Sequence, residues 1–231
     1  MTGANSAPPD RALIVFARAP SAPGKTRLTA NLPSDRARAL REALLLDTLD
    51  AVRAAHVPLV IAFTPDDAGD EMSLLAPGIT LVRQHGADLG ERMQHALDEV
   101  LNVGTGMVAL VGSDLPTLPA SHVSDAFAMF DSDADIVLGP TEDGGFYLLA
   151  ARRRVTPVLG GIDWSAPAVR GRVVEAALGA GLTVGVGPSW WDVDTRADLQ
   201  RVVRDGNRNM ARRTKLLAAT ALTEPPTDRR E

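Results

Sequence analysis

The stretch Val108–Pro119, VALVGSDLPTLP, decides the fold that this sequence predicts. Its apolar run Val108–Val111 is typical of a strand buried on both faces of a parallel sheet. Two prolines follow, and since proline cannot donate to a ladder, the strand is expected to end before them. Asp114 is thereby predicted to lie at the carboxyl end of a central strand, where open α/β sheets bind their ligands.

A carboxylate at that position needs a partner, because an unpaired buried charge is costly. A divalent metal that carries phosphates is one possible partner for Asp114. The plainer interpretation, which position alone leaves open, is that Asp114 caps a turn or the next helix. The neighbouring Ser113 holds this carboxylate, contacts the ligand or, as is more common for such a serine, satisfies only the backbone.

The composition limits the class of protein. With 231 residues, of which 45% are hydrophobic, the chain suits one α/β domain. We expect that domain to span residues 11–223, between a disordered N-terminus at 1–10 and a disordered tail at 224–231. A formal net charge of -5 and an aromatic content of 4% argue against a nucleic-acid partner.

The chain contains no cysteine, which excludes disulfides, thiolate-bound zinc and thiol nucleophiles. No apolar stretch reaches membrane-spanning length. The first ten residues, MTGANSAPPD, lack the basic and apolar blocks of a signal peptide. We therefore expect no membrane span and a cytoplasmic protein.

Predicted strands alternate with predicted helices along the chain, a pattern that indicates a doubly wound, mostly parallel α/β sheet. A hairpin-like pair of strands around the DGG loop at 143–145 predicts a small antiparallel insertion in that sheet. The expected strands lie at 12–17, 57–63, 79–82, 108–111, 135–138, 146–150 and 182–186. The expected helices lie at 34–55, 88–101, 121–130, 166–180 and 197–203.

The loop after the first strand carries three cations, Arg18, Lys25 and Arg27, around Gly24. Cations in a short loop between a strand and a helix suit a phosphate chain, although a solvated turn is the plainer alternative. The sequence APSAPGKT at 19–26 nearly matches a P-loop. Its two prolines lack the N–H groups that a P-loop needs, and Pro33 cuts off the helix that should follow, so we do not favour that interpretation.

A second loop, Glu142–Tyr147, contains Asp143, Gly144 and Gly145. Paired glycines allow positive φ angles and a close approach of the backbone to a ligand. We expect Asp143, Gly144 and Gly145 to bind the sugar or the acceptor. A plain hairpin turn is the alternative, because Asp-Gly is by itself a hairpin signal.

A third acidic segment is Asp192–Thr195. In extended backbone Asp192 and Asp194 point to the same side, and two such carboxylates repel unless a cation lies between them. Thr195 and Asp198 are predicted to form a capping box that starts a helix. For Asp194 we favour a metal role together with Asp114.

Four motifs in this order, ARAPSAPGKTRL, LVGSDLPTL, LGPTEDGGFYLLA and WWDVDTRADL, resemble the rSAM/selenodomain-associated glycosyltransferase family. That family belongs to the nucleotide-diphospho-sugar transferase superfamily with the GT-A fold, a Rossmann-like three-layer sandwich. The likeness covers about residues 13–203. A more distant one, to the 2-phospho-lactate guanylyltransferases, rests on the KTRL-like loop, the acidic turn and the DGG turn.

The resemblance implies that Asp114 is the metal-binding acid and that Lys25 and Arg27 face nucleotide phosphates. Because Asp114 stands in SDLP rather than in a DxD triplet, Asp194 must supply the second metal ligand. The first loop also lacks the double glycine of many nucleotidyltransferases. The predicted nucleotide-binding residues are Ala17, Arg18, Gly24, Lys25, Arg27, Ser113 and Asp114.

We therefore predict a transferase dependent on Mg²⁺ or Mn²⁺, with Asp114, Asp194, Lys25 and Arg27 as its catalytic residues and Asp143 or Asp192 as any general base. Its partners would be a nucleotide sugar or nucleoside triphosphate and a small-molecule acceptor. The family likeness narrowly favours glycosyl transfer, whereas three cations in one loop favour a triphosphate and nucleotidyl transfer. The incomplete DxD motif leaves open a non-catalytic nucleotide-binding protein.

Overall fold

The computed structural model describes residues 8–155, 158–207 and 209–223. Most of the predicted N-terminal disorder, at 1–7, and the predicted tail at 224–231 lie outside the described residues. Asp10 is placed: its carbonyl accepts a hydrogen bond of 2.9 Å from the Met107 N–H. No helix in the described part of the chain is long and apolar enough to cross a membrane.

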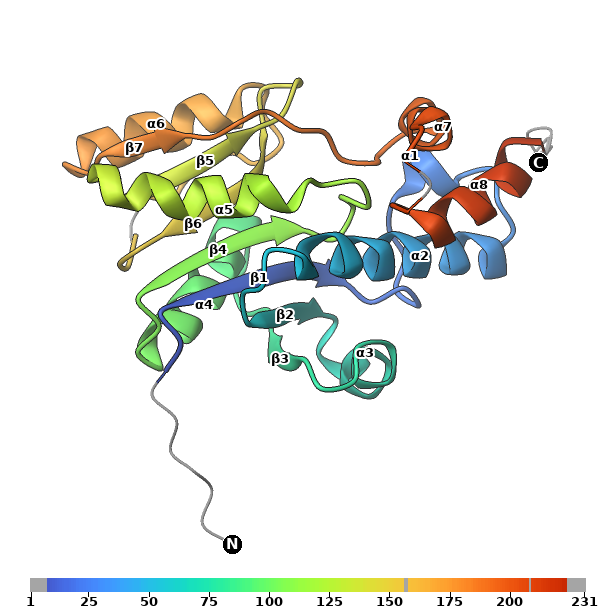
Figure 1. The fold of residues 1–231 in the computed structure, drawn as a ribbon, viewed down its shortest axis with the longest axis horizontal. Helices are drawn as coiled ribbons and strands as arrows, with labels where there is room; N and C mark the ends of the chain where they lie inside the picture. The colour runs from blue at the N-terminus through green and yellow to red at the C-terminus, as the bar shows by residue number, and fades with distance from the viewer. Residues whose placement is uncertain (1–7, 156–157, 208, 224–231) are drawn as a thin grey trace, which may run out of the picture.

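The centre of the molecule is one mixed sheet (Figure 1), with the strand order β3-β2-β1-β4-β6-β5-β7 among the described residues. All neighbouring strands pair in parallel except β6, which is antiparallel to both β4 and β5. The predicted antiparallel insertion is thus confirmed as a single reversed strand. The strands are β1 (Arg11–Arg18), β2 (Leu59–Thr64), β3 (Thr80–Arg83), β4 (Met107–Gly112), β5 (Ile136–Pro140), β6 (Phe146–Ala151) and β7 (Val184–Val186).

Helices cover both faces of this sheet, which confirms the three-layer α/β fold. Side chains alternate along a buried strand, so Leu13 and Val15 of β1 pack with one set of helices and Ile14 with the other. Helices α2, α3 and α5 lie on the first face, and α4 and α6 on the second. The α-helices are α1 (Thr26–Thr29), α2 (Ser34–Arg53), α3 (Gly69–Leu75), α4 (Leu89–Asn102), α5 (Ala120–Ala128), α6 (Val169–Gly179), α7 (Arg196–Arg204) and α8 (Arg212–Thr223).

Helix α8 is an element that the sequence analysis did not predict, as are α1 and α3. It packs with α2 and α7 in a separate apolar cluster, seen at the right of Figure 1. Its first turn is capped from outside its own sequence, because the buried carboxylate of Asp47 in α2 accepts from the Thr214 N–H at 2.7 Å. A helix end satisfied by a distant acid leaves no local capping motif to recognise.

The topology brings the four motifs to one edge of the sheet. From β1 the chain moves outward to β2 and β3, then returns to place β4 on the other side of β1. The carboxyl ends of these parallel strands form the crevice at such a switch point. The loop between β5 and β6 reaches the same edge, because β5 runs parallel to β4 and ends there.

Candidate active site

The turn that carries Asp114 is held by Thr48 of α2. The buried Thr48 hydroxyl donates to the Ser113 carbonyl (3.0 Å) and accepts from the Leu115 N–H (2.9 Å). It therefore spans the turn on both sides of Asp114 and pairs one backbone group on each side, of which the Leu115 N–H is buried. Asp114 does not cap the next helix, since α5 follows Pro119 and has no side-chain cap.

Lys25 directs its ammonium group at Asp114. Its Nζ lies 2.8 Å from Asp114 Oδ2, and only 14% of the Lys25 side chain is exposed. The residue has a φ of 54°, in the left-handed region that costs a non-glycine residue about 1–2 kcal/mol. Tertiary contacts hold it there, because Nζ also donates to the Val193 carbonyl at 2.8 Å.

The acidic segment around Asp194 runs beside the Asp114 turn. The N–H of the buried Val193 donates to the Asp114 carbonyl at 2.9 Å. Asp194 Oδ1 lies 3.4 Å from Lys25 Nζ, and its other oxygen forms an ion pair with Arg27. Asp114 and Asp194 thus meet at one lysine, Lys25, while the metal predicted between them stays a prediction.

Burial and charge oppose each other in this cluster. Burial lowers the pKa of Lys25, but the carboxylates of Asp114, Asp192 and Asp194 together outweigh it, so the pKa of Lys25 is raised. Burial raises the pKa of Asp114 against the attraction of Lys25, and Asp194 adds to the rise. The pKa of Asp192 is likewise raised, first by burial and then by the two other acids. Three acids around one lysine favour a further cation.

The donor set is compatible with a hard divalent cation. The carboxylate oxygens of Asp114 and Asp194 converge on the position that Lys25 Nζ takes, and carboxylate oxygen is the donor that Mg²⁺ prefers. The described residues contain no group of three or more Asp, Glu, His or Cys side chains arranged to hold a metal ion. A metal held by two acids would therefore draw its remaining ligands from phosphate and water.

A cavity of about 320 Å³ opens beside this cluster and is lined by four cations among the described residues. Arg18 and Lys25 come from the predicted loop, and Gly24 gives Arg18 room, since a Cβ at position 24 would lie 3.1 Å from Arg18 Cδ. The sequence analysis missed the other two, Arg41 of α2 and Arg92 of α4. Neither belongs to a motif, and only the packing of the helices brings them to the loop.

Arg41 and Arg92 keep their charge available in this 320 Å³ cavity, which we call the phosphate cavity after the ligand predicted for its loop. Arg41 Nε donates to the Pro20 carbonyl at 3.0 Å, and Arg92 Nε donates to the Gly86 carbonyl at 3.1 Å. A carbonyl partner orients a guanidinium group without neutralising it. Burial and the nearby Arg38 lower the pKa of Arg41 by more than the carboxylate of Glu71 raises it.

The far end of the phosphate cavity is formed by the ends of β1, β2 and β3. Ala17 and Thr64 line it, together with the buried Gln84. The Gln84 side-chain amide donates to the carbonyls of Ala17 and Ala62, at 3.0 and 2.9 Å, and so joins β1 to β2 at this edge. Ala17 therefore lines the cavity with its carbonyl already engaged by Gln84.

The loop between β5 and β6 closes the other side of the crevice. Asp143 accepts from the Thr141 hydroxyl at 2.5 Å and from the Gly145 N–H at 3.1 Å, and the Thr141 bond is the main cause of its lowered pKa. Gly144 has a φ of 88°, which favours glycine. This loop is a hairpin connection, and its Asp143 and Gly145 line a second cavity of about 620 Å³ together with Arg27.

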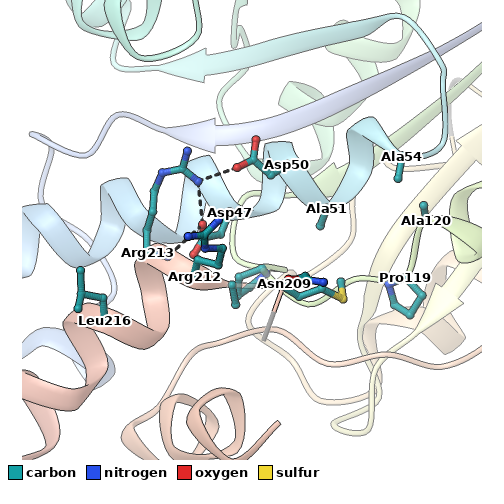
Figure 2. A pocket seen from close by; sticks show the side chains of 13 residues that line it. Asp47, Asp50, Ala51, Ala54, Pro119, Ala120, Asn209, Arg212, Arg213 and Leu216 are labelled. Atoms are coloured by element: carbon teal, nitrogen blue, oxygen red, sulfur yellow. Dashed lines mark hydrogen bonds and ion pairs between the residues drawn. The ribbon is translucent and has the colours of Figure 1, made fainter. Parts of the chain in front are cut away.

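A larger cavity, of about 780 Å³, lies elsewhere, between α2, the segment 116–120 and the start of α8 (Figure 2). Its acids Asp47 and Asp50 both pair with Arg213, at 2.9 and 2.6 Å. None of the residues predicted for the site lines it. Size alone therefore does not single out the candidate active site, which lies where acids and cations converge at the strand ends.

Fold and site together define a transferase of the GT-A and nucleotidyltransferase-like class. The fold matches the crystal structure of a "putative nucleotide-diphospho-sugar transferase" from Desulfovibrio desulfuricans G20, with a TM-score of 0.81, 32% identity, and coverage of 92% of this chain and 95% of that one. The chain belongs to the bacterial family described as "Uncharacterized protein conserved in bacteria (DUF2064)", whose model matches residues 48–166.

Two curated relatives are guanylyltransferases. The chain is 32% identical to the phosphoenolpyruvate guanylyltransferase of Salinispora arenicola over 203 residues, which cover 85% of this chain and 88% of the relative. It is 32% identical to the 2-phospho-L-lactate guanylyltransferase of Haloarcula marismortui over 122 residues, or 52% of each. The predicted likeness to guanylyltransferases is thereby confirmed, while membership of the rSAM/selenodomain-associated glycosyltransferases stays a prediction.

Proposed function

We propose that this transferase moves a nucleotidyl group from a nucleoside triphosphate to a small-molecule acceptor and releases pyrophosphate. The observation that carries the proposal is the phosphate cavity, where Arg18, Lys25, Arg41 and Arg92 face two acids. Four cations against two acids leave the cavity net positive, as a phosphate chain requires, and two of the four lie outside the predicted loop. The guanylyltransferase relatives point the same way and make GTP the first nucleotide to test.

The residues of the chain fall into distinct roles in this reaction. Lys25, Arg41 and Arg92 bind the phosphate chain and stabilise the charge that develops on the leaving pyrophosphate. Asp114 and Asp194 would hold Mg²⁺ or Mn²⁺, which would neutralise phosphate charge when bound. Positioning and charge stabilisation account for most of the catalysis of phosphoryl-type transfers.

A general base is needed only where the acceptor is a hydroxyl group. Of the two candidates, Asp143 is the poorer one, because its carboxylate is occupied by Thr141 and Gly145 and its pKa is lowered. The other candidate for hydroxyl acceptors is Asp192, whose pKa is raised by burial, although Asp192 is not among the residues that line either cavity.

Glycosyl transfer is the second candidate. The Desulfovibrio structure bears a sugar-transferase name, and the 620 Å³ cavity beside Asp143 and Gly145 has room for a sugar. The chemistry differs in the bond that breaks, because a nucleoside diphosphate would then leave from the sugar. Our proposal therefore reverses the narrow preference that the sequence gives to glycosyl transfer.

Ligand-dependent unfolding separates the two functions. Each nucleoside triphosphate and each common nucleotide sugar is added with Mg²⁺ or Mn²⁺, and thermal unfolding and pyrophosphate release are measured. A ligand at about a hundredfold excess over its Kd adds roughly 2.7 kcal/mol of stability. We expect protection by a triphosphate and release of pyrophosphate on addition of acceptor. Protection by a nucleotide sugar alone would establish glycosyl transfer instead.

A further inference from the structure

The second cavity adjoins the phosphate cavity. Phe16 and Leu89 line both cavities. Gly112 lines the second cavity, and the next residue in the chain, Ser113, lines the phosphate cavity. Arg27 lies at the junction: it lines the second cavity, and its guanidinium group pairs with Asp194 of the phosphate cavity. A molecule in the second cavity can therefore present one end to the reacting phosphates.

The walls of this second cavity are mainly apolar. Its aromatic side is built from Phe146 and Trp164, whose rings meet edge to face with centroids 6.3 Å apart. Gly90 makes room for the indole, because a Cβ at position 90 would lie 2.7 Å from Trp164 Cζ2. Other apolar side chains of the lining are Leu89, Met93 and Leu110, and the hydroxyl-bearing residues Tyr147 and Ser165 also line it.

Few charges face this cavity. Among the described residues that line it, Arg27 and Asp143 are charged, and Asp143 is engaged within its own loop. A small phosphorylated carboxylic acid would bring two anionic groups and almost no apolar surface. Such a ligand would cover little of the apolar wall. The guanidinium group of Arg27 would also have to bind both of the ligand's anionic groups.

We propose that the acceptor is an amphiphilic phosphomonoester, with an apolar or aromatic body in the second cavity and its phosphate at Arg27. This assignment rests on the proposed nucleotidyl transfer. An oxygen of the acceptor phosphate attacks the α-phosphorus of the triphosphate, and the bond from that phosphorus to the bridging oxygen breaks. Pyrophosphate leaves with the electron pair of that bond, and the product is a nucleoside diphosphate ester of the apolar alcohol.

Binding without turnover tests this assignment. Cyclohexyl phosphate and phosphoenolpyruvate are titrated into the full-length protein by calorimetry, both alone and with saturating Mg²⁺ and a non-hydrolysable GTP analogue. We expect cyclohexyl phosphate to bind at least about tenfold more tightly, because it buries an apolar ring and phosphoenolpyruvate does not. Equal binding, or tighter binding of phosphoenolpyruvate, under both conditions would overturn the assignment.

Variants locate the site. Trp164→Ala is expected to weaken the binding of cyclohexyl phosphate about tenfold, and Trp164→Phe to keep most of the affinity. Leu178→Ala truncates an exposed side chain of α6 and is expected to leave this affinity unchanged. Thermal unfolding shows whether each variant is folded. If Trp164→Ala is folded and binds normally, the assignment is wrong. If cyclohexyl phosphate binds but no nucleoside triphosphate does, the proposed nucleotidyl transfer is wrong while the assignment of an apolar ligand to this cavity stands.

Discussion

The hydroxyl of Thr48 accepts a hydrogen bond of 2.9 Å from the backbone N–H of Leu115, across the turn that carries Asp114. The same hydroxyl donates to the carbonyl of Ser113. One side chain of α2 thus fixes the backbone on both sides of the proposed metal ligand. Thr48 is a positioning residue, because it contacts the turn and not the phosphate cavity.

Thr48→Val keeps the shape of the side chain and removes both hydrogen bonds. It leaves the Leu115 N–H without its partner, which is expected to cost about 1–3 kcal/mol of unfolding free energy in urea titrations. Triphosphate affinity should fall as well, since the Asp114 turn loses its support. Thr48→Ser keeps the hydroxyl and serves as the control. Unchanged stability and affinity in Thr48→Val would rule out the positioning role.

Arg41 and Arg92 provide a second prediction. Replacement of either by Gln should weaken triphosphate binding about tenfold or more, because a charge-assisted hydrogen bond to phosphate is lost. A nucleoside monophosphate, with fewer phosphates to contact, should be affected less. Arg53→Gln is the matched control on α2, since Arg53 pairs with Asp50. Equal losses for triphosphate and monophosphate would place these arginines outside the phosphate chain.

The contacts of Asp135 lead us to predict that stability depends on pH. Its carboxylate accepts from the Thr183 N–H at 3.1 Å and pairs with Arg152 and Arg153. These contacts lower its pKa to about 2, and the Thr183 hydrogen bond contributes most. Because the pKa of Asp135 is lower in the folded state, its carboxylate stabilises the fold at any pH above its unfolded-state pKa of about 4. This contribution to stability disappears as the pH falls toward 2.

Asp135→Asn should therefore cost about 2 kcal/mol at neutral pH and much less near pH 2. Urea titrations across this range measure the difference between wild type and variant. Asp131→Asn is a suitable control on the preceding segment, because Asp131 is exposed. A difference that does not shrink on acidification would mean that Asp135 stabilises the fold by packing and not by charge.

The parts of the fold that could be predicted are those with strong local signals. Apolar runs ended by prolines or glycines marked the central strands, and the strand ends then placed Lys25, Asp114 and Asp194 at one edge. Short or weakly patterned elements were missed, as with α8, whose N-terminus is capped by the distant Asp47.

The site residues that could not be predicted are those set by tertiary packing. Thr48, Arg41 and Arg92 sit in helices where Thr and Arg are ordinary residues, and nothing in the local sequence separates them from solvent-exposed neighbours. Their relation to the Asp114 turn exists only once α2 and α4 pack on opposite faces of the sheet. Local sequence motifs mark the loops at strand ends, whereas the side chains that reach those loops from helices are placed by tertiary packing.

Uptake of Mn²⁺ in the presence of GTP tests the shared cation site of Asp114 and Asp194 most directly. Calorimetric titration compares the wild type with Asp114→Asn, Asp194→Asn and, as a control in the other acidic cavity, Asp50→Asn. We predict that each site variant weakens Mn²⁺ binding at least about tenfold while Asp50→Asn leaves it unchanged. Equal Mn²⁺ uptake by the wild type and Asp114→Asn would contradict the site and the transfer reaction built on it.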